Sequence, residues 1–119
     1  MVLIMKHYIY VDDIRENPDW YNSHLTSDWR PHVCRTAQET IDLITAICYS
    51  GETAQFILDL DHDLGEGNEN ELEPSGYEIC KWIVENQIPL VGFHIHSMNP
   101  VGANNMRQLL AHYEYKELF

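Results

Sequence analysis

The chain has 119 residues, of which 45% are hydrophobic and 11% aromatic, and this length and composition predict one globular domain spanning residues 1–119. Asp and Glu number 19 against 7 Lys and Arg, which gives a formal net charge of -12. This acidity argues against binding of duplex DNA, which needs cations to neutralise its phosphates. A small anionic ligand is still compatible, provided that a metal ion, a helix N-terminus or histidines offset the acidic field.

Three cysteines, Cys34, Cys48 and Cys80, are widely spaced among apolar neighbours. An odd count without a CxxC motif predicts reduced, mostly buried thiols and a cytoplasmic protein. The first six residues are not followed by a sustained apolar segment. We therefore expect neither a secretion signal nor a membrane-spanning segment, and no membrane partner.

The first half of the chain alternates strand and helix signals. β-Branched and aromatic residues predict strands over residues 7–11, 31–35 and 56–60. Pro18 opens a predicted helical turn between the first two strands. Before the third strand, Thr36 begins a capping-box pattern and Gly51 marks the end of a helix. The apolar stripe of this helix is predicted at Ala37, Ile41, Ile44 and Cys48.

The second half begins with an acidic loop over residues 65–74. Ser75 then caps a predicted helix that ends near Asn86, with its apolar stripe at Tyr77, Cys80, Ile83 and Val84. Residues 90–97 predict a fourth strand. Asn99 and Pro100 predict the start of a last helix, with apolar positions at Val101, Met106, Leu109 and Leu110. Residues 113–119 leave room only for a short edge strand.

The alternating elements predict an α/β fold, a small doubly wound parallel sheet with helices on both faces and a shortened C-terminus. Ligands of such folds bind beyond the carboxyl ends of the strands, near the switch point of the sheet. Ionisable residues lie at or just beyond the carboxyl ends of three of the predicted strands: Asp12 and Asp13, then Asp59, Asp61 and Asp63, then His94 and His96.

Four of these carboxylates predict a divalent metal site, with Mg²⁺ or Mn²⁺ as the cofactor. Carboxylates that lie close together repel one another unless a cation joins them, and oxygen donors suit these ions. The predicted ligands are Asp12, Asp13, Asp59 and Asp61. The alternative is structural, because some of these carboxylates can cap helices or pair with Arg15.

Histidines at the same edge predict proton transfer. His94 and His96 stand two apart on a strand and therefore project to one side. One can act as general base on water and a neighbour as general acid on a leaving alkoxide. The predicted catalytic set is His62, His94, His96 and Asp61, with His96 the strongest candidate. Either strand histidine can instead be an interior hydrogen-bonding residue, and a zinc site of His94, His96 and Asp61 is an alternative.

The segment from Ser97 to Gly102 places a hydroxyl and backbone N–H groups at a helix start. Such a start attracts anions, so Ser97, Asn99 and Gly102 are predicted to bind phosphate. The alternative is simple capping of the helix by Asn99, which requires the same geometry.

These positions together resemble a response-regulator receiver domain, in which an acidic pair holds magnesium and the Asp of the third strand accepts a phosphoryl group. Asp12, Asp13 and Ser97 match positions of that family, and either Asp59 or Asp61 matches the phosphoacceptor. The final receiver strand and helix have no clear counterpart, and Lys116 is a weak match to the receiver lysine. The resemblance therefore implies signalling less strongly than it implies the fold.

Three longer motifs, residues 59–65, 76–82 and 93–103, are similar to cyclic-phosphate processing receiver domains, and the likeness runs from Tyr8 to Met106. This resemblance implies a hydrolase of the cyclic phosphodiesterase type. Its substrate would be a small phosphorylated molecule such as a cyclic nucleotide, or an RNA end carrying a 2′,3′-cyclic phosphate. The alternatives are a phospho-accepting receiver and a non-catalytic module that binds a nucleotide or a protein partner.

Overall fold

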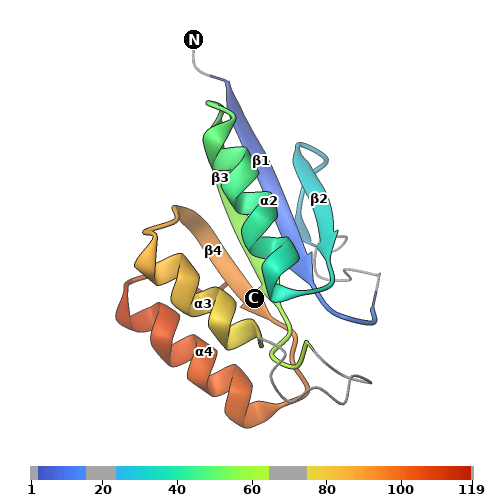
Figure 1. Cartoon of the computed structure of the whole chain (residues 1–119), viewed down its shortest axis with the longest axis vertical. Coiled ribbons are helices and arrows are strands. Elements are labelled where there is room, and N and C mark those ends of the chain that lie inside the picture. The colour runs from blue at the N-terminus through green and yellow to red at the C-terminus, as the bar shows by residue number, and fades with distance from the viewer. Residues whose placement is uncertain (1–2, 16–23, 65–74, 119) are drawn as a thin grey trace.

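Four parallel strands form one sheet in the order β2-β1-β3-β4 (Figure 1). The structure is a computed structural model that describes residues 3–15, 24–64 and 75–118. The strands are β1 (Ile4–Val11), β2 (Trp29–Cys34), β3 (Thr53–Leu60) and β4 (Leu90–Ile95). The chain changes direction across the sheet between β1 and β3, so the switch point lies at the carboxyl ends of these two strands. The predicted α/β parallel sheet is confirmed.

The observed strands start or end a few residues away from the predicted positions. β1 and β3 each begin three residues early, because Ile4 pairs with Thr53 and extends the ladder beyond the apolar run. β4 ends at Ile95. His96 and Ser97 therefore lie in the loop after β4 rather than within a strand.

Three helices follow strands in the described part of the chain: α2 (Ala37–Tyr49), α3 (Gly76–Glu85) and α4 (Pro100–His112). The predicted caps are confirmed. Thr36 accepts a hydrogen bond from the backbone N–H of Glu39 (3.0 Å), and Ser75 accepts one from that of Tyr77 (3.2 Å). Asn99 accepts one from that of Gly102 (2.9 Å).

Two residues of the predicted apolar stripes are exposed instead. Cys48 is exposed because the buried face of α2 runs through Ala37, Thr40 and Ile44, and Cys48 lies at its margin. The prediction of mostly buried thiols therefore holds for Cys34 and Cys80 only. Val101 is exposed because α4 buries Gly102, Ala103, Met106 and Leu110.

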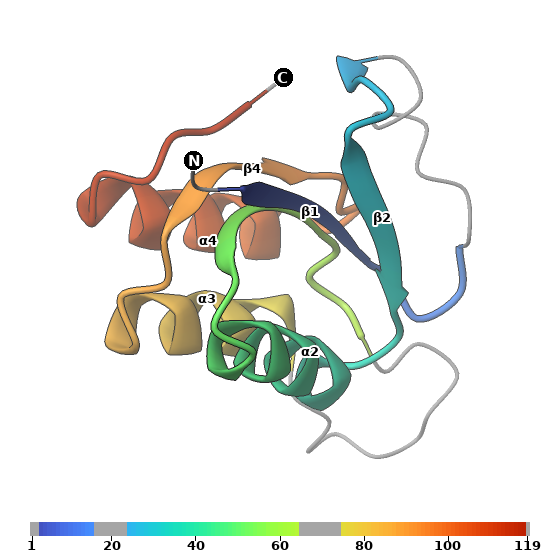
Figure 2. The ribbon, with the colours of Figure 1, turned by 90° about the horizontal axis from the view of Figure 1, so that it is seen from above.

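The described helices all pack on one face of the sheet. Their buried side chains join the strand residues that point to that face in a single core, which includes Ile9, Leu58, Phe93, Ile44, Ile83 and Met106. Figure 2 shows α2 and α3 on one side of the sheet and the C-terminal segment on the other. That other face carries a smaller cluster of Tyr8, Tyr10, Trp29 and Ile57, packed against Leu25 and Leu118.

Two predicted features, the helical turn at Pro18 and the acidic loop 65–74, lie outside the described residues. The expected edge strand after α4 is reduced to one parallel bridge between Glu117 and Phe93. Gly92 allows this approach, because a Cβ there would lie 2.5 Å from the side chain of Leu118. Among the residues that the structure describes, no helix has the length and apolar character needed to cross a bilayer.

Candidate functional site

The ends of β1, β3 and β4 are level with one another. Val11 pairs with Leu60, which pairs with Ile95. The next residue of each strand is polar, and two backbone hydrogen bonds continue the ladder past the strand ends. The N–H of Asp61 donates to the carbonyl of Val11 and that of His96 to the carbonyl of Leu60, both at 3.0 Å. Asp12, Asp61 and His96 therefore emerge together at the carboxyl edge.

His96 is held between two buried carboxylates. Its Nδ1 donates to Oδ1 of Asp59 (2.6 Å) and its Nε2 to Oδ2 of Asp12 (3.0 Å). The ring of Tyr10 stacks on the imidazole, with centroids 4.6 Å apart and planes 12° from parallel. Because carboxylates only accept hydrogen bonds, both contacts are made by donating ring nitrogens, which requires the imidazolium.

The charges around His96 agree with this protonation state. Burial alone lowers the pKa of His96, but the hydrogen bond and charge of Asp59 and the hydrogen bond with Asp12 outweigh burial, so the pKa is raised. Burial raises the pKa of Asp12, but the backbone N–H groups of Arg15 and Ile14 and the imidazole of His96 outweigh it. The pKa of Asp12 is therefore lowered.

Asp59 is 1% exposed, and both of its oxygens have partners. Oδ1 faces His96, and Oδ2 accepts a hydrogen bond from the hydroxyl of the fully buried Tyr8. Burial and the charge of Asp59 raise the pKa of Tyr8, so its hydroxyl stays protonated and continues to donate. Asp59 thus orients the imidazole of His96 and is itself oriented by Tyr8.

The loop after β1 is fixed by its own backbone. Oδ1 of Asp12 accepts hydrogen bonds from the N–H groups of Ile14 (2.9 Å) and Arg15 (2.8 Å). The guanidinium of Arg35 donates to the carbonyls of Asp12 (3.0 Å) and Arg15 (2.7 Å). These contacts direct the remaining oxygen of Asp12 toward His96. Asp13, the other predicted ligand in this pair, is half-buried.

Asp61 completes a group that has metal-ligating geometry. One ligand atom each from Asp12, Asp61 and His96 can be chosen so that all lie within 4.8 Å of one another. We call these three residues the donor group. Burial and the charge of Asp12 raise the pKa of Asp61, against opposing effects from His96, the Asp63 N–H and the Ser97 side chain. Two carboxylates that disfavour each other's charge form a site that a cation would stabilise.

The predicted metal and catalytic residues are therefore only partly brought together. In the described part of the chain, the donor group contains Asp12, Asp61 and His96, whereas Asp59 lies behind His96 and Asp13 lies outside the group. The zinc set considered from the sequence differs from this group in having His94 in place of Asp12.

His94 lies opposite Asp59 in the register of β3 and β4, one strand position before the edge. Its Nδ1 lies 3.5 Å from the carbonyl oxygen of Leu118. It also lines a separate groove of about 360 Å³ together with Arg107, Glu117 and Leu118. The structure thus places His94 against the C-terminal segment and not in the donor group.

His62 forms a second ionisable pair beside the donor group. Its Nδ1 lies 2.7 Å from Oδ1 of Asp63, and the Asn99 side chain donates to the same oxygen at 3.3 Å. The hydrogen bond from His62 lowers the pKa of Asp63, which keeps this carboxylate ionised. The imidazole packs over Gly102, where a Cβ would lie 2.4 Å from the ring. Because Gly102 has no side chain, the imidazole of His62 can lie directly against the first turn of α4.

Three N–H groups in and just after the predicted phosphate-binding loop form internal hydrogen bonds. The N–H of Asn99 donates to Oγ of Ser97 (3.0 Å), that of Gly102 to the Asn99 side chain, and that of Ala103 to the Asn99 carbonyl. Pro100 has no N–H. The capping alternative is thus realised here. The prediction that Ser97, Asn99 and Gly102 bind phosphate stays a prediction, supported by the positive end of α4 at this edge.

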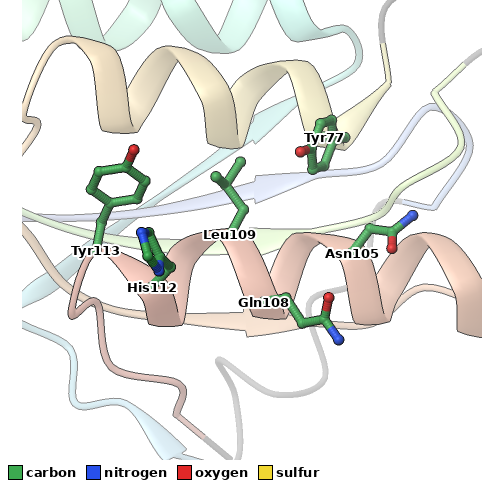
Figure 3. Close-up of a pocket in the computed structure, with 6 residues that line it drawn as sticks. All are labelled: Tyr77, Asn105, Gln108, Leu109, His112 and Tyr113. Carbon is green, nitrogen blue, oxygen red and sulfur yellow. The ribbon is translucent and has the colours of Figure 1, made fainter.

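A larger groove, of about 650 Å³, lies between α3 and α4 and away from the donor group (Figure 3). It is lined by Tyr77, Asn105, Gln108, Leu109, His112 and Tyr113. None of these residues was predicted to take part in the site, and none contacts the donor group through an observed hydrogen bond.

Two site residues, Tyr8 and Tyr10, were not predicted from the sequence. Both lie on β1, at two and four residues before Asp12, so the strand period of two places all three on one side. An aromatic residue at such positions is ordinarily assigned to the core, and these two are also buried there. Their polar and stacking contacts depend on Asp59 and His96, which arrive from other strands.

A family model described as the cyclic-phosphate processing receiver domain matches residues 7–112. The match includes the donor group, the His62–Asp63 pair, and all of β2, β3, β4 and the three described helices. Neither a curated protein nor a solved structure matches the chain. The parallel order β2-β1-β3-β4 and the acidic switch point agree with the resemblance that the sequence motifs indicated. The chain belongs to the family of cyclic-phosphate processing receiver domains.

Proposed function

We propose that this domain is a metal-assisted phosphoesterase that opens a cyclic phosphate to a phosphomonoester. The observation that carries the proposal is the chain of contacts from Tyr8 through Asp59 to His96, which ends in the donor group. A metal-ligating histidine typically donates its second ring N–H to a carboxylate, which fixes the tautomer and the ring orientation. His96 has that arrangement once it is deprotonated: Nδ1 would keep its hydrogen bond to Asp59, and Nε2, which donates to Asp12 in the imidazolium, would lose its proton to solvent when an ion binds and become a ligand.

The donor group fits a divalent ion chemically. It offers two carboxylates and one imidazole whose ligand atoms lie within 4.8 Å of one another. Burial and then the charge of Asp12 raise the pKa of Asp61, and a cation bound there would favour its ionised form. Mg²⁺ prefers an all-oxygen shell, whereas a mixed nitrogen and oxygen set suits Mn²⁺ and other transition metals better. An ion held there would neutralise the negative charge that develops on the phosphoryl oxygens.

The His62–Asp63 pair is the proposed general base. Asp63 holds Nδ1 of His62, so Nε2 is the ring nitrogen that takes a proton from the attacking water. The water oxygen bonds to phosphorus while the bond from phosphorus to one ring oxygen breaks. The departing alkoxide takes a proton from solvent, and the product carries a phosphomonoester and a free hydroxyl. The positive end of the α4 dipole favours the phosphate at this position.

The direct test is hydrolysis of 2′,3′- and 3′,5′-cyclic mononucleotides, followed by ³¹P NMR with and without Mn²⁺ or Mg²⁺. We expect turnover that depends on Mn²⁺ and is lost in Asp61→Asn and His96→Gln. Asp42→Asn is the matched control, because Asp42 lies on α2, outside the donor group, where its carboxylate accepts a hydrogen bond from the side chain of Gln38. The absence of turnover, with either ion, of both cyclic mononucleotides and of an oligonucleotide ending in a 2′,3′-cyclic phosphate would rule the proposal out.

A phospho-accepting receiver would have to use Asp61 as its acceptor. Asp59 is 1% exposed with both oxygens engaged, whereas Asp61 is half-buried at the edge. Labelling by a small phosphodonor that is lost in Asp61→Asn and retained in Asp59→Asn would favour this alternative. Ligand binding without hydrolysis or labelling would favour a non-catalytic binding module.

A further inference from the structure

The charges that surround the donor group are predominantly negative. Asp12, Asp13, Asp61 and Asp63 lie at the carboxyl edge, and Asp59 lies just behind it. In the described ranges, the basic residues that follow strand ends at this edge are Arg15, after β1, and Arg35, after β2. The guanidinium of Arg35 donates hydrogen bonds to two backbone carbonyls of the loop after β1 and therefore holds that loop in place.

The other described basic residues lie elsewhere. Three of them pair with acidic side chains: Lys6 with Asp28, Lys81 with Glu78, and Arg107 with Glu117. Arg30 is the second residue of β2, and the backbone of Lys116 lies beside Phe93 in the middle of β4. The described surface thus offers no row of cations leading to the donor group.

This charge distribution separates two kinds of substrate. Each further nucleotide of an RNA chain adds a phosphate charge that binding proteins neutralise with Lys or Arg. A cyclic mononucleotide carries its charge on the one phosphate that the ion and the α4 N-terminus would hold. An acidic edge with few cations therefore repels the several charges of the first substrate more strongly than the single charge of the second, which the ion and the α4 N-terminus would offset.

Exposed apolar residues lie in the loops that follow β1 and β4 and in the first turn of α4, close in the chain to the donor group. Met98 is 81% exposed and follows Ser97, whose side chain hydrogen bonds with Asp61. Val101 is 70% exposed in the first turn of α4. Ile14 is 59% exposed, and its N–H donates to Asp12. We call Ile14, Met98 and Val101 the apolar rim. A nucleobase has apolar faces that such side chains can cover, and an unbranched methionine adapts readily to a flat ring.

We infer that the substrate is a free cyclic mononucleotide, whose base lies against the apolar rim, and not the cyclic phosphate at the end of an RNA chain. This inference rests on the proposed function and names the substrate class of the same site. It follows from the acidic edge, the absence of a described cation row, and the exposure of the rim residues in the segments that carry or follow the donor group.

The first experiment compares kcat/KM for a 2′,3′-cyclic mononucleotide with that for a decanucleotide ending in the same group. At low salt, about 50 mM, we expect the decanucleotide to be at least about tenfold poorer, and the difference to narrow at about 300 mM as repulsion is screened. Equal or better turnover of the decanucleotide overturns the inference.

If neither substrate is opened, the proposed function fails, and the inference is tested by binding alone. Calorimetry with Mn²⁺ present then compares the same two molecules as ligands. Tighter binding of the mononucleotide supports the inference, and equal or tighter binding of the decanucleotide overturns it.

The second experiment tests the rim. Met98→Ser and Val101→Ser should each raise KM for the cyclic mononucleotide by about three- to tenfold, because less apolar surface is covered. They should leave KM for a cyclic phosphate without a base, such as glycerol 1,2-cyclic phosphate, unchanged. Tyr49→Ser is the control, since Tyr49 is 87% exposed at the end of α2. An equal rise for both substrates, or no rise for the mononucleotide, contradicts a base contact.

Discussion

Nδ1 of His96 lies 2.6 Å from Oδ1 of Asp59, a carboxylate that is buried beneath the edge of the sheet. The two residues come from neighbouring strands and are 37 positions apart in the chain. Because Asp59 is held from behind by Tyr8, the imidazole has one orientation, and its other nitrogen faces Asp12. Four predictions test what this contact and the neighbouring His62 pair do.

Replacement of Asp59 by Asn should weaken metal binding without removing a ligand. The amide keeps the shape of the side chain but carries no negative charge, and its NH₂ group can face Nδ1 of His96 in place of an oxygen. The hydrogen bond that fixes the tautomer of the ring is then weakened or lost. We expect Mn²⁺ affinity to fall by about 10- to 100-fold, measured by calorimetric titration. Asp42→Asn should bind Mn²⁺ like the wild type. Unchanged affinity in Asp59→Asn would show that Asp59 does not orient a ligand.

Replacement of Tyr8 by Phe should destabilise the folded protein although the shape of the side chain hardly changes. The change removes the hydroxyl that donates to the buried Oδ2 of Asp59 and leaves that oxygen without this donor. We expect the free energy of unfolding to fall by about 1–3 kcal/mol, measured by urea denaturation with EDTA present. Tyr49→Phe removes an exposed hydroxyl and serves as the control. Equal stability of Tyr8→Phe and the wild type would contradict the contact.

The pH dependence of stability should report the imidazolium of His96 in metal-free buffer. The pKa of His96 is higher in the folded state than in the unfolded state. Its stabilising contribution is therefore fully present below the unfolded pKa, about 6.5, and is lost as pH rises through the folded pKa. The difference in unfolding free energy between the wild type and His96→Gln should shrink from about pH 6 to about pH 9. A difference in unfolding free energy that grows over this interval would contradict a raised pKa of His96 in the folded state.

Introduction of a methyl group at Gly102 should displace His62. A Cβ there would lie 2.4 Å from Cγ of the imidazole, too close for the ring to stay in place. Alanine favours helix more than glycine by about 1 kcal/mol, so α4 should persist while turnover falls. The control is Asn104→Ala, on an exposed position of the same helix. Normal turnover in Gly102→Ala would show that His62 takes no part in the reaction.

Much of the fold follows from local signals in the sequence. Thr36, Ser75 and Asn99 each start a helix where their capping side chains predict one. The apolar runs before Asp12 and Asp59 form adjacent central strands. The ends of these strands were harder to predict, because parallel pairing extends β1 and β3 into residues such as Thr53 that have no apolar signal of their own.

The roles of the carboxylates could be predicted only in part. Alternation places Asp59 and Asp61 on one side of β3, but the sheet register decides which of them is level with Asp12. That register is a property of three strands and not of the segment 59–65. The two histidines show the same limit. Alternation places His94 and His96 on one side, but the sequence does not show that the C-terminal segment lies against His94 while His96 lies at the edge of the sheet.

The most direct measurement of the central claim is a crystal structure of the protein grown with Mn²⁺, with the ion located by its anomalous scattering. The account predicts a single strong peak bounded by Asp12, Asp61 and Nε2 of His96, with Nδ1 of His96 still donating to Asp59. An ion located elsewhere, or the edge empty at saturating Mn²⁺, would contradict it.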